Sequence, residues 1–159
     1  MAIVWTRIDD RLIHGQVASS WLSHVKAEQV IIADDEVANN DVQKNILKMA
    51  APGVKVNIFS VEHFSEIYKT KPINRRTLLL LPNTLAARQL VENGVALEQL
   101  NFGGMRSRDD RKSYRHDLCF TPTEEEALEF LLAAGVKVDY QMAAYDTPEP
   151  LAPLLASLK

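Results

Sequence analysis

Thr77-Leu78-Leu79-Leu80-Leu81 carries four leucines in a row, and Pro82-Asn83 follows them at once. A strand with one solvent-exposed face alternates apolar and polar side chains, whereas a strand covered on both faces does not. The stretch therefore predicts a buried strand in a parallel sheet that has helices on both faces.

Short apolar segments alternate with helical patterns on both sides of this strand. Further strands are predicted at residues 3–8, 29–33, 54–59, 97–102 and 136–142. Helices are predicted over residues 15–25, after Asn39 or Asn40, after Ser60, over 84–93 before Gly94, and over 151–158. Because this alternation requires right-handed crossovers, the strands should run mostly parallel. We expect an α/β fold: a single three-layer domain over residues 1–159, with a central mostly parallel sheet of six to seven strands, one antiparallel edge strand, and helices on both faces.

The segment between the fifth strand and the last strand is harder to assign. Residues 106–114 are dense in charge, and two interpretations remain open: a solvated loop, or a loop that contacts a partner or a phosphate. Residues 115–120 predict a short edge strand with His116 exposed. Thr121-Pro122-Thr123-Glu124 has the features of a capping box with proline at the first helical position, and Gly135 should close that helix.

Composition excludes several classes of function. With 159 residues and a net charge of -3, the chain has no basic footprint for nucleic acid. The single cysteine, Cys119, has no partner for a disulfide or a zinc motif, so we expect no metal site and a cytoplasmic protein. Neither a signal peptide nor an apolar run of about 20 residues is found, so any work at a membrane should be that of a peripheral partner.

The loop after the first predicted strand contains the candidate catalytic residues. It reads Arg7-Ile8-Asp9-Asp10-Arg11-Leu12-Ile13-His14-Gly15-Gln16 and follows Ile3-Val4-Trp5. Arginine binds phosphate oxygens through a planar fork, and neutral histidine is a nucleophile near pH 7. Gly15, without a side chain, would let backbone amides of the next helix approach an anion. The pattern indicates phosphoryl transfer, although Arg-Asp pairs in loops are commonly only surface ion pairs.

Within this loop, His14 is the predicted nucleophile. Arg7 and Arg11 are the candidates to neutralise phosphoryl oxygens, and Asp9 could orient either an arginine or the imidazole. Spacing does not decide which arginine does which, nor which ring nitrogen reacts. The chain lacks the G-x-x-x-x-G-K-[ST] nucleotide loop, so we expect a relay without cofactor or metal rather than an ATP-dependent kinase.

Two further sets of residues bear on the site. Because parallel strands end at one edge of a sheet, the residues expected to gather there are His14, Asp34, Ser60, Asn83 and Gly104. The remaining histidines, His24, His63 and His116, have sufficient structural or surface roles.

The loop, extended to Val17, resembles the active-site signature of the IIB components of the sugar phosphotransferase system (PTS), mannose/fructose/sorbose family. The resemblance continues through residues 30–35, Asn101-Phe102-Gly103-Gly104-Met105 and Gly135-Val136, and covers nearly the whole chain. It implies a central sheet of mainly parallel strands and a histidine, here His14, that accepts phosphate from the IIA component. It also implies transfer onward to a sugar imported through the membrane components IIC and IID.

The sugar is not identified by the sequence, and mannose, fructose, sorbose and N-acetylgalactosamine all fit the same chemistry. The arginines of the loop 106–112 depart from the family pattern, so the contacts of that loop stay open, as does homo-oligomer formation. Two rival functions remain open. The first is a receiver-like module phosphorylated on Asp34 or Asp35, which end a strand in a similar order of elements. The second is a non-catalytic α/β binding protein in which His14 is only structural.

Overall fold

The computed structural model describes residues 3–15 and 17–159, so Gln16 of the signature lies outside the described residues. Seven strands within these ranges form one sheet in the order β3-β2-β4-β1-β5-β8-β9. Their bounds are β1 Ile3–Asp9, β2 Gln29–Ala33, β3 Lys55–Phe59, β4 Thr77–Leu81, β5 Gln99–Gly104, β8 Lys137–Tyr140 and β9 Glu149–Pro150. All neighbours pair in parallel except β8 and β9.

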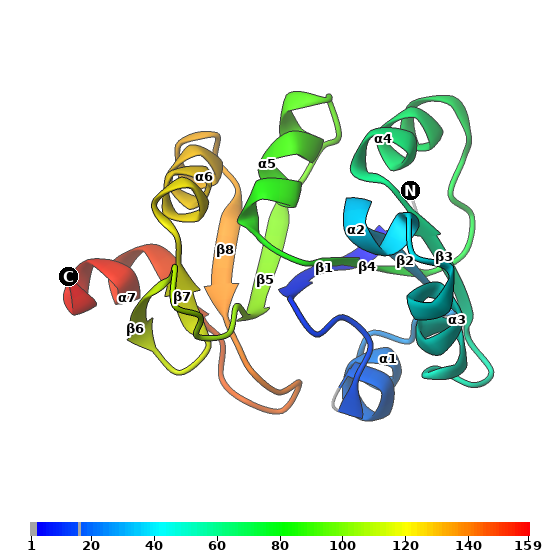
Figure 1. Cartoon of the computed structure of the whole chain (residues 1–159), viewed down its shortest axis with the longest axis horizontal. Helices are drawn as coiled ribbons and strands as arrows, with labels where there is room; N and C mark the ends of the chain where they lie inside the picture. The colour runs from blue at the N-terminus through cyan, green and yellow to red at the C-terminus, as the bar shows by residue number, and fades with distance from the viewer. Residues whose placement is uncertain (1–2, 16) are drawn as a thin grey trace.

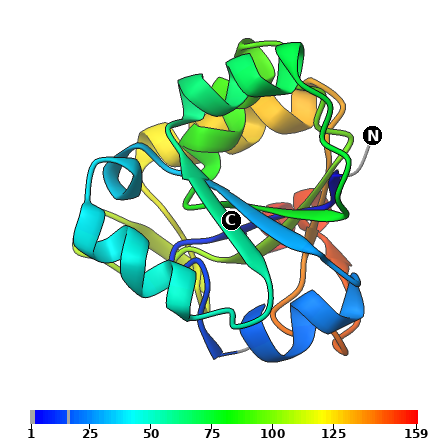
Figure 2. The same ribbon diagram turned by 90° about the vertical axis from the view of Figure 1, so that its right-hand side faces the viewer.

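Helices cover both faces of the sheet, as Figures 1 and 2 show. One layer contains α4 Val61–Thr70, α5 Thr84–Glu92, α6 Pro122–Ala133 and α7 Leu151–Leu158. The other contains the π-helix η1 Val17–Trp21, which continues into α1 Leu22–His24, together with α2 Asp35–Ala38 and α3 Asp41–Met49. The predicted fold class, a mostly parallel sheet with an antiparallel edge and helices on both faces, is confirmed.

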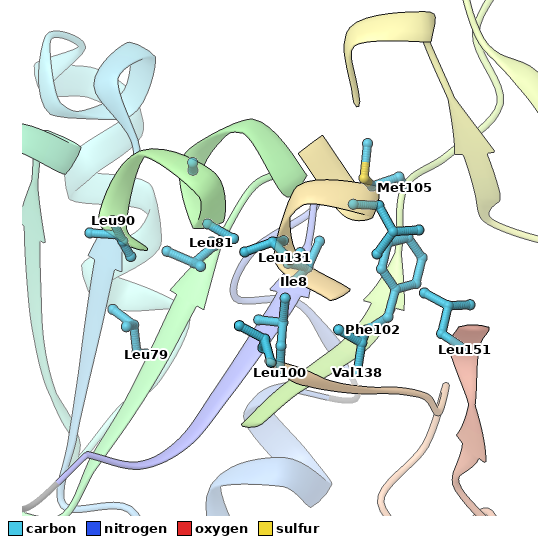
Figure 3. Packing of buried hydrophobic residues seen from close by; sticks show 14 of the residues in the cluster. Ile8, Leu79, Leu81, Leu90, Leu100, Phe102, Met105, Leu131, Val138 and Leu151 are labelled. Carbon is cyan, nitrogen blue, oxygen red and sulfur yellow. The ribbon is translucent and has the colours of Figure 1, made fainter. Parts of the chain in front are cut away.

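Each layer has its own apolar core. Figure 3 shows Ile8 of β1 and Leu79 of β4 in the cluster that α5 and α6 cover through Leu90 and Leu131. The second cluster contains Leu78 and Leu80 of the same β4 strand. Alternate leucines of the opening stretch therefore pack in opposite layers, which explains why no polar residue interrupts Leu78 to Leu81. Among residues 3–15 and 17–159, no helix combines the length and apolar character needed to cross a membrane.

Capping chemistry sets the starts of the helices at the carboxyl edge of the sheet. Asn40 caps α3, Ser60 caps α4 and Asn83 caps α5, each through a side-chain oxygen that accepts a backbone N–H bond. The predicted capping box of Thr121 and Glu124 is present at α6. Asp34, after β2, caps the short helix α2, which was not predicted.

The prediction of an edge strand over residues 115–120 was wrong. The chain instead forms a separate antiparallel hairpin of β6 Lys112–Arg115 and β7 Leu118–Phe120. It turns at His116 and at Asp117, whose φ of 54° is a left-handed conformation that aspartate tolerates better than most residues. The antiparallel edge of the main sheet is β9, which follows the proline-rich segment after Asp146.

Candidate active site

The loop after β1 lies at the carboxyl edge of a central strand, because β1 pairs with both β4 and β5. The Asp10 N–H donates to Gly104 O at 3.1 Å, which ties the loop to the end of β5. Leu12 adopts a φ of 58° with its side chain buried. A leucine rarely takes this left-handed conformation, so the loop is held by its surroundings rather than by local preference.

His14 is oriented by the last residue of β1. Its Nε2 lies 2.8 Å from Asp9 Oδ2, with the carboxylate fully buried and the imidazole about a quarter exposed. Burial would raise the pKa of Asp9, but the hydrogen bond with His14, the Arg11 amide and nearby positive charge lower it below its ordinary value. Asp9 is therefore an anion that accepts a hydrogen bond from Nε2–H, and this tautomer leaves the lone pair on Nδ1. The expectation that Asp9 could orient the imidazole fits this geometry.

Arg7 is buried and 1% exposed. Its guanidinium donates to Gln141 O and Met142 O, both at 2.8 Å, and to the side chain of Asn101. The Trp21 ring packs over it with 4.4 Å between Cζ and the ring centroid. Burial is the main reason why the pKa of Arg7 falls to about 10, despite the nearby Asp9 carboxylate. Arg7 therefore joins β1 to β5, to the segment after β8 and to η1.

Gly103 provides the space that Arg7 occupies, because a methyl group there would overlap the guanidinium. We predict that Gly103→Ala lowers the free energy of unfolding by about 1 to 3 kcal/mol, the usual cost of overpacking. Gly15→Ala is the matched control, since a methyl group at Gly15 meets no atom within 4 Å. Urea unfolding of both variants measures the difference; equal stability would mean that Arg7 moves aside without cost.

Arg11 has a more open position. Its side chain is 35% exposed and lies between two carboxylates, with Nε 3.5 Å from Asp9 Oδ1 and Nη2 3.7 Å from Asp117 Oδ2. The backbone N–H of Arg11 also donates to Asp9 Oδ1 at 3.0 Å. Both predicted arginines thus lie beside Asp9, but only Arg11 combines this position with substantial solvent access.

The remaining acidic residues and histidines singled out from the sequence bind helix N-termini, pack against aromatic rings or face solvent. Asp34 accepts the amides of Glu36 and Val37, and the neighbouring Asp35 accepts the amide of Val61. His24 packs edge-on against Trp21 and His63 against Phe59, while the His116 side chain is 81% exposed.

Several contributors to the site were not found by sequence reasoning. Asp117 reaches Arg11 from the hairpin turn, and Asp10 accepts hydrogen bonds from Arg106 and Arg111. Arg111 in turn forms a buried bidentate ion pair with Glu124. Its Nε donates to Oε1 and its Nη2 donates to Oε2, both at 2.9 Å. The solvated interpretation of the charged loop is therefore wrong at Arg111, although Arg106 and Arg108 are exposed. The charge density of the loop was a signal, but it did not reveal these partners.

The fold, with this loop sequence at the end of its central strand, defines an EIIB component of a sugar phosphotransferase system of the sorbose/mannose type. The sequence profile of the "PTS system sorbose subfamily IIB component" matches residues 3–159. The chain belongs to that family. EIIB components work with other PTS components in sugar transport and act as phosphotransferases, so a transferase role follows from membership.

Individual relatives agree with this family. The sorbose-specific EIIB component of Klebsiella pneumoniae is 36% identical, across 92% of this chain and 90% of that protein. The solved IIBSor domain of the sorbose permease from Klebsiella pneumoniae has a TM-score of 0.92 and 34% identity, covering 99% of this chain and 98% of that domain. The mannose-specific EIIAB component of Escherichia coli K12 is 32% identical over 99% of this chain, which spans 50% of that protein.

Proposed function

We propose that the chain is a histidine phosphocarrier that accepts a phosphoryl group on His14 and passes it to an imported sugar. The observation that carries the proposal is the 2.8 Å contact between His14 Nε2 and the buried Asp9 carboxylate at the carboxyl edge of the sheet. A proton held on Nε2 makes Nδ1 the nucleophilic nitrogen. Nδ1 is therefore the proposed site of phosphorylation.

This arrangement serves both steps, acceptance of the phosphoryl group from the donor and its onward transfer to the sugar. As Nδ1 attacks, the P–N bond of the donor's phosphohistidine breaks, and its electron pair returns to the donor's ring. In the onward step a sugar hydroxyl oxygen attacks phosphorus and loses its proton to a base, while the Nδ1–P pair returns to His14. Asp9 stabilises the positive charge that the ring carries while it is phosphorylated and protonated on Nε2.

The two arginines take different parts in the proposal. Arg11, partly exposed and beside Asp9, contacts the phosphoryl oxygens in transit. Arg7 is committed to buried protein acceptors, so it acts on the site mainly by holding Asp9 and the segment after β8 in place. Its direct contact with phosphate, expected from the sequence, has less support from this geometry.

The partners proposed are those of a complete PTS. The donor is the phosphorylated IIA component, which the name of the mannose-specific EIIAB relative of Escherichia coli supports by joining IIA and IIB in one protein. The acceptor is a sugar held by the membrane components IIC and IID, with this chain as a single IIB domain over residues 1–159, peripheral to the transporter on its cytoplasmic side. No cofactor or metal enters the step. The sugar itself is left open.

The receiver-like alternative has little support at Asp34 and Asp35. Both carboxylates accept backbone N–H bonds at helix N-termini, and a phosphoryl group there would have to displace a cap. The binding-protein alternative gives no reason for a buried anion beside His14.

We predict that label from a phosphorylated IIA component appears on His14 alone. A phosphohistidine is labile in acid and survives alkali, whereas hydroxylamine cleaves an aspartyl phosphate. A triple His24, His63 and His116→Gln variant should keep full acceptance, because His24 and His63 pack against aromatic rings and His116 is an exposed side chain beside Asp117. Peptide mapping of the label to Asp34 or Asp35, or loss of acceptance in a folded triple variant, would reject the assignment.

A further inference from the structure

Asp117 belongs to the hairpin between β6 and β7 and yet reaches the loop that carries His14. Its backbone O accepts the Met105 N–H at 2.7 Å, which holds the turn against the end of β5. Gly104 allows this approach, since a methyl group there would lie 3.2 Å from Asp117 Cβ. The Asp117 side chain is only 11% exposed. The carboxylate is thus fixed in place by the fold.

Asp117 and Asp9 lie on either end of the Arg11 guanidinium, so Arg11 contacts two carboxylates. Arg11 Nη2 lies 3.7 Å from Asp117, and Arg11 Nε lies 3.5 Å from Asp9. His116 Nε2 also lies 3.5 Å from Asp117 Oδ2, and the His116 side chain is exposed. A phosphoryl dianion on His14 must therefore compete with a fixed carboxylate for the one partly exposed guanidinium among these groups.

We propose that Asp117 restrains Arg11 and thereby keeps the phosphoryl group on His14 weakly compensated and ready to leave. The inference rests on the proposed function of His14 and adds a positioning residue to it. A carrier gains nothing from stabilising its phosphorylated form as strongly as its transfer state, because excess ground-state binding slows the next step. Asp117 sets this balance by holding part of the Arg11 charge on a carboxylate.

Asp117→Asn tests whether Asp117 lowers the equilibrium ratio of phosphorylated to free protein. Asparagine keeps the shape of the side chain and tolerates the left-handed φ of 54°, so the turn should persist. Asp117→Gly, which also suits this φ, is a second variant. With His14 at equilibrium with a fixed ratio of phosphoramidate to ammonium, both variants should raise the ratio of phosphorylated to free protein about three- to tenfold. This is the scale of one partly exposed charge interaction. Hydrolysis of the phosphohistidine should slow in parallel.

Two comparisons separate this role from a general effect of charge or fold. Asp139→Asn removes a carboxylate of similar exposure, 17%, which lies beside Lys137 on β8, and should leave the ratio unchanged. In an Arg11→Ala background, Asp117→Asn should have no further effect if it acts through Arg11. ³¹P NMR gives the equilibrium ratio, and thermal unfolding checks the fold.

The possible outcomes separate the role of Asp117 from the proposed function of His14 as phosphoryl acceptor. An unchanged or lower ratio in Asp117→Asn and Asp117→Gly, or an increase that persists without Arg11, overturns the role of Asp117 while His14 remains the acceptor. If the unmodified chain gains no phosphohistidine at His14 from phosphorylated IIA or from phosphoramidate, the proposed function itself fails.

Discussion

Asp9→Asn should slow phosphoryl acceptance by His14 about 100- to 10,000-fold, from the typical cost of losing one preorganised hydrogen bond up to the cost of replacing a buried carboxylate that sets a histidine tautomer. Asp9 Oδ1 accepts the Arg11 N–H at 3.0 Å, and Oδ2 faces His14 Nε2 at 2.8 Å. In asparagine, the amide oxygen must remain opposite the Arg11 N–H, so the NH₂ group faces Nε2. That group donates a hydrogen bond to Nε2, which must then carry the lone pair, so the ring proton moves to Nδ1. The proposed nucleophile then has no free lone pair.

Single-turnover transfer from phosphorylated IIA measures the rate, and ¹⁵N NMR of the imidazole reports the tautomer directly. Asp34→Asn is the matched control, because asparagine caps a helix as well as aspartate does and Asp34 lies at the same edge. It should accept phosphate at the normal rate. A near-normal rate in Asp9→Asn would remove Asp9 from the mechanism, and loss of acceptance in Asp34→Asn would favour the receiver-like alternative.

The fold could be predicted where local pattern and tertiary environment agree. The strands at 29–33 and 77–81 were predicted with the observed bounds, because every side chain in them is buried and all residues after the first are apolar. The caps Ser60 and Thr121 were predicted because a cap is a local hydrogen bond within three residues. These features depend on a few neighbouring residues, which a sequence displays.

The features that the sequence did not reveal depend on distant partners. The hairpin of β6 and β7 forms apart from the main sheet, with Met105 beside Leu118, so no local pattern separates it from an edge strand. The π-helical turn of η1 brings Trp21 over Arg7, and π-helices of this kind are frequent at functional sites but have no simple sequence signature.

In the site too, contacts between neighbouring residues could be predicted and contacts with distant residues could not. His14 and Asp9 were recognised together because they are five residues apart in one loop. The buried state of Arg7 depends on Asn101 and on carbonyl groups 134 and 135 residues away in the sequence. An arginine in a charged loop has the same appearance in sequence whether it binds phosphate or buried carbonyl groups. Only the fold assigns Arg11 to the open position and Arg7 to the interior.

Arg111→Met should lower the free energy of unfolding by about 3 to 5 kcal/mol, because it leaves the Glu124 carboxylate buried without its main partner. The side chains of Arg111 and Glu124 are 2% and 3% exposed, and Arg111 Nη1 also donates to Asp10 Oδ2 at 3.0 Å. For a chain of this size the midpoint of thermal unfolding should fall by roughly 6 to 20 °C. Arg108→Met, which alters a half-exposed arginine 3.8 Å from the same carboxylate, should change stability by less than about 1 kcal/mol.

The double variant Arg111→Met with Glu124→Gln should recover much of the loss, since glutamine is neutral and can retain the capping box with Thr121.

The pair of Arg111 and Glu124 should also make the stability of the fold depend on pH in a definite direction. Burial would raise the pKa of Glu124, but the hydrogen bonds from Arg111 and the Thr121 amide lower it below 4.5. A lowered pKa in the folded state contributes stability above the ordinary pKa and loses it as pH falls through the folded value. The stability difference between the native chain and Glu124→Gln should therefore be constant near neutral pH and shrink below about pH 4.5. Urea unfolding across this pH range measures it, and a difference that grows in acid, or an Arg111→Met variant no weaker than Arg108→Met, would mean that the pair does not stabilise the fold.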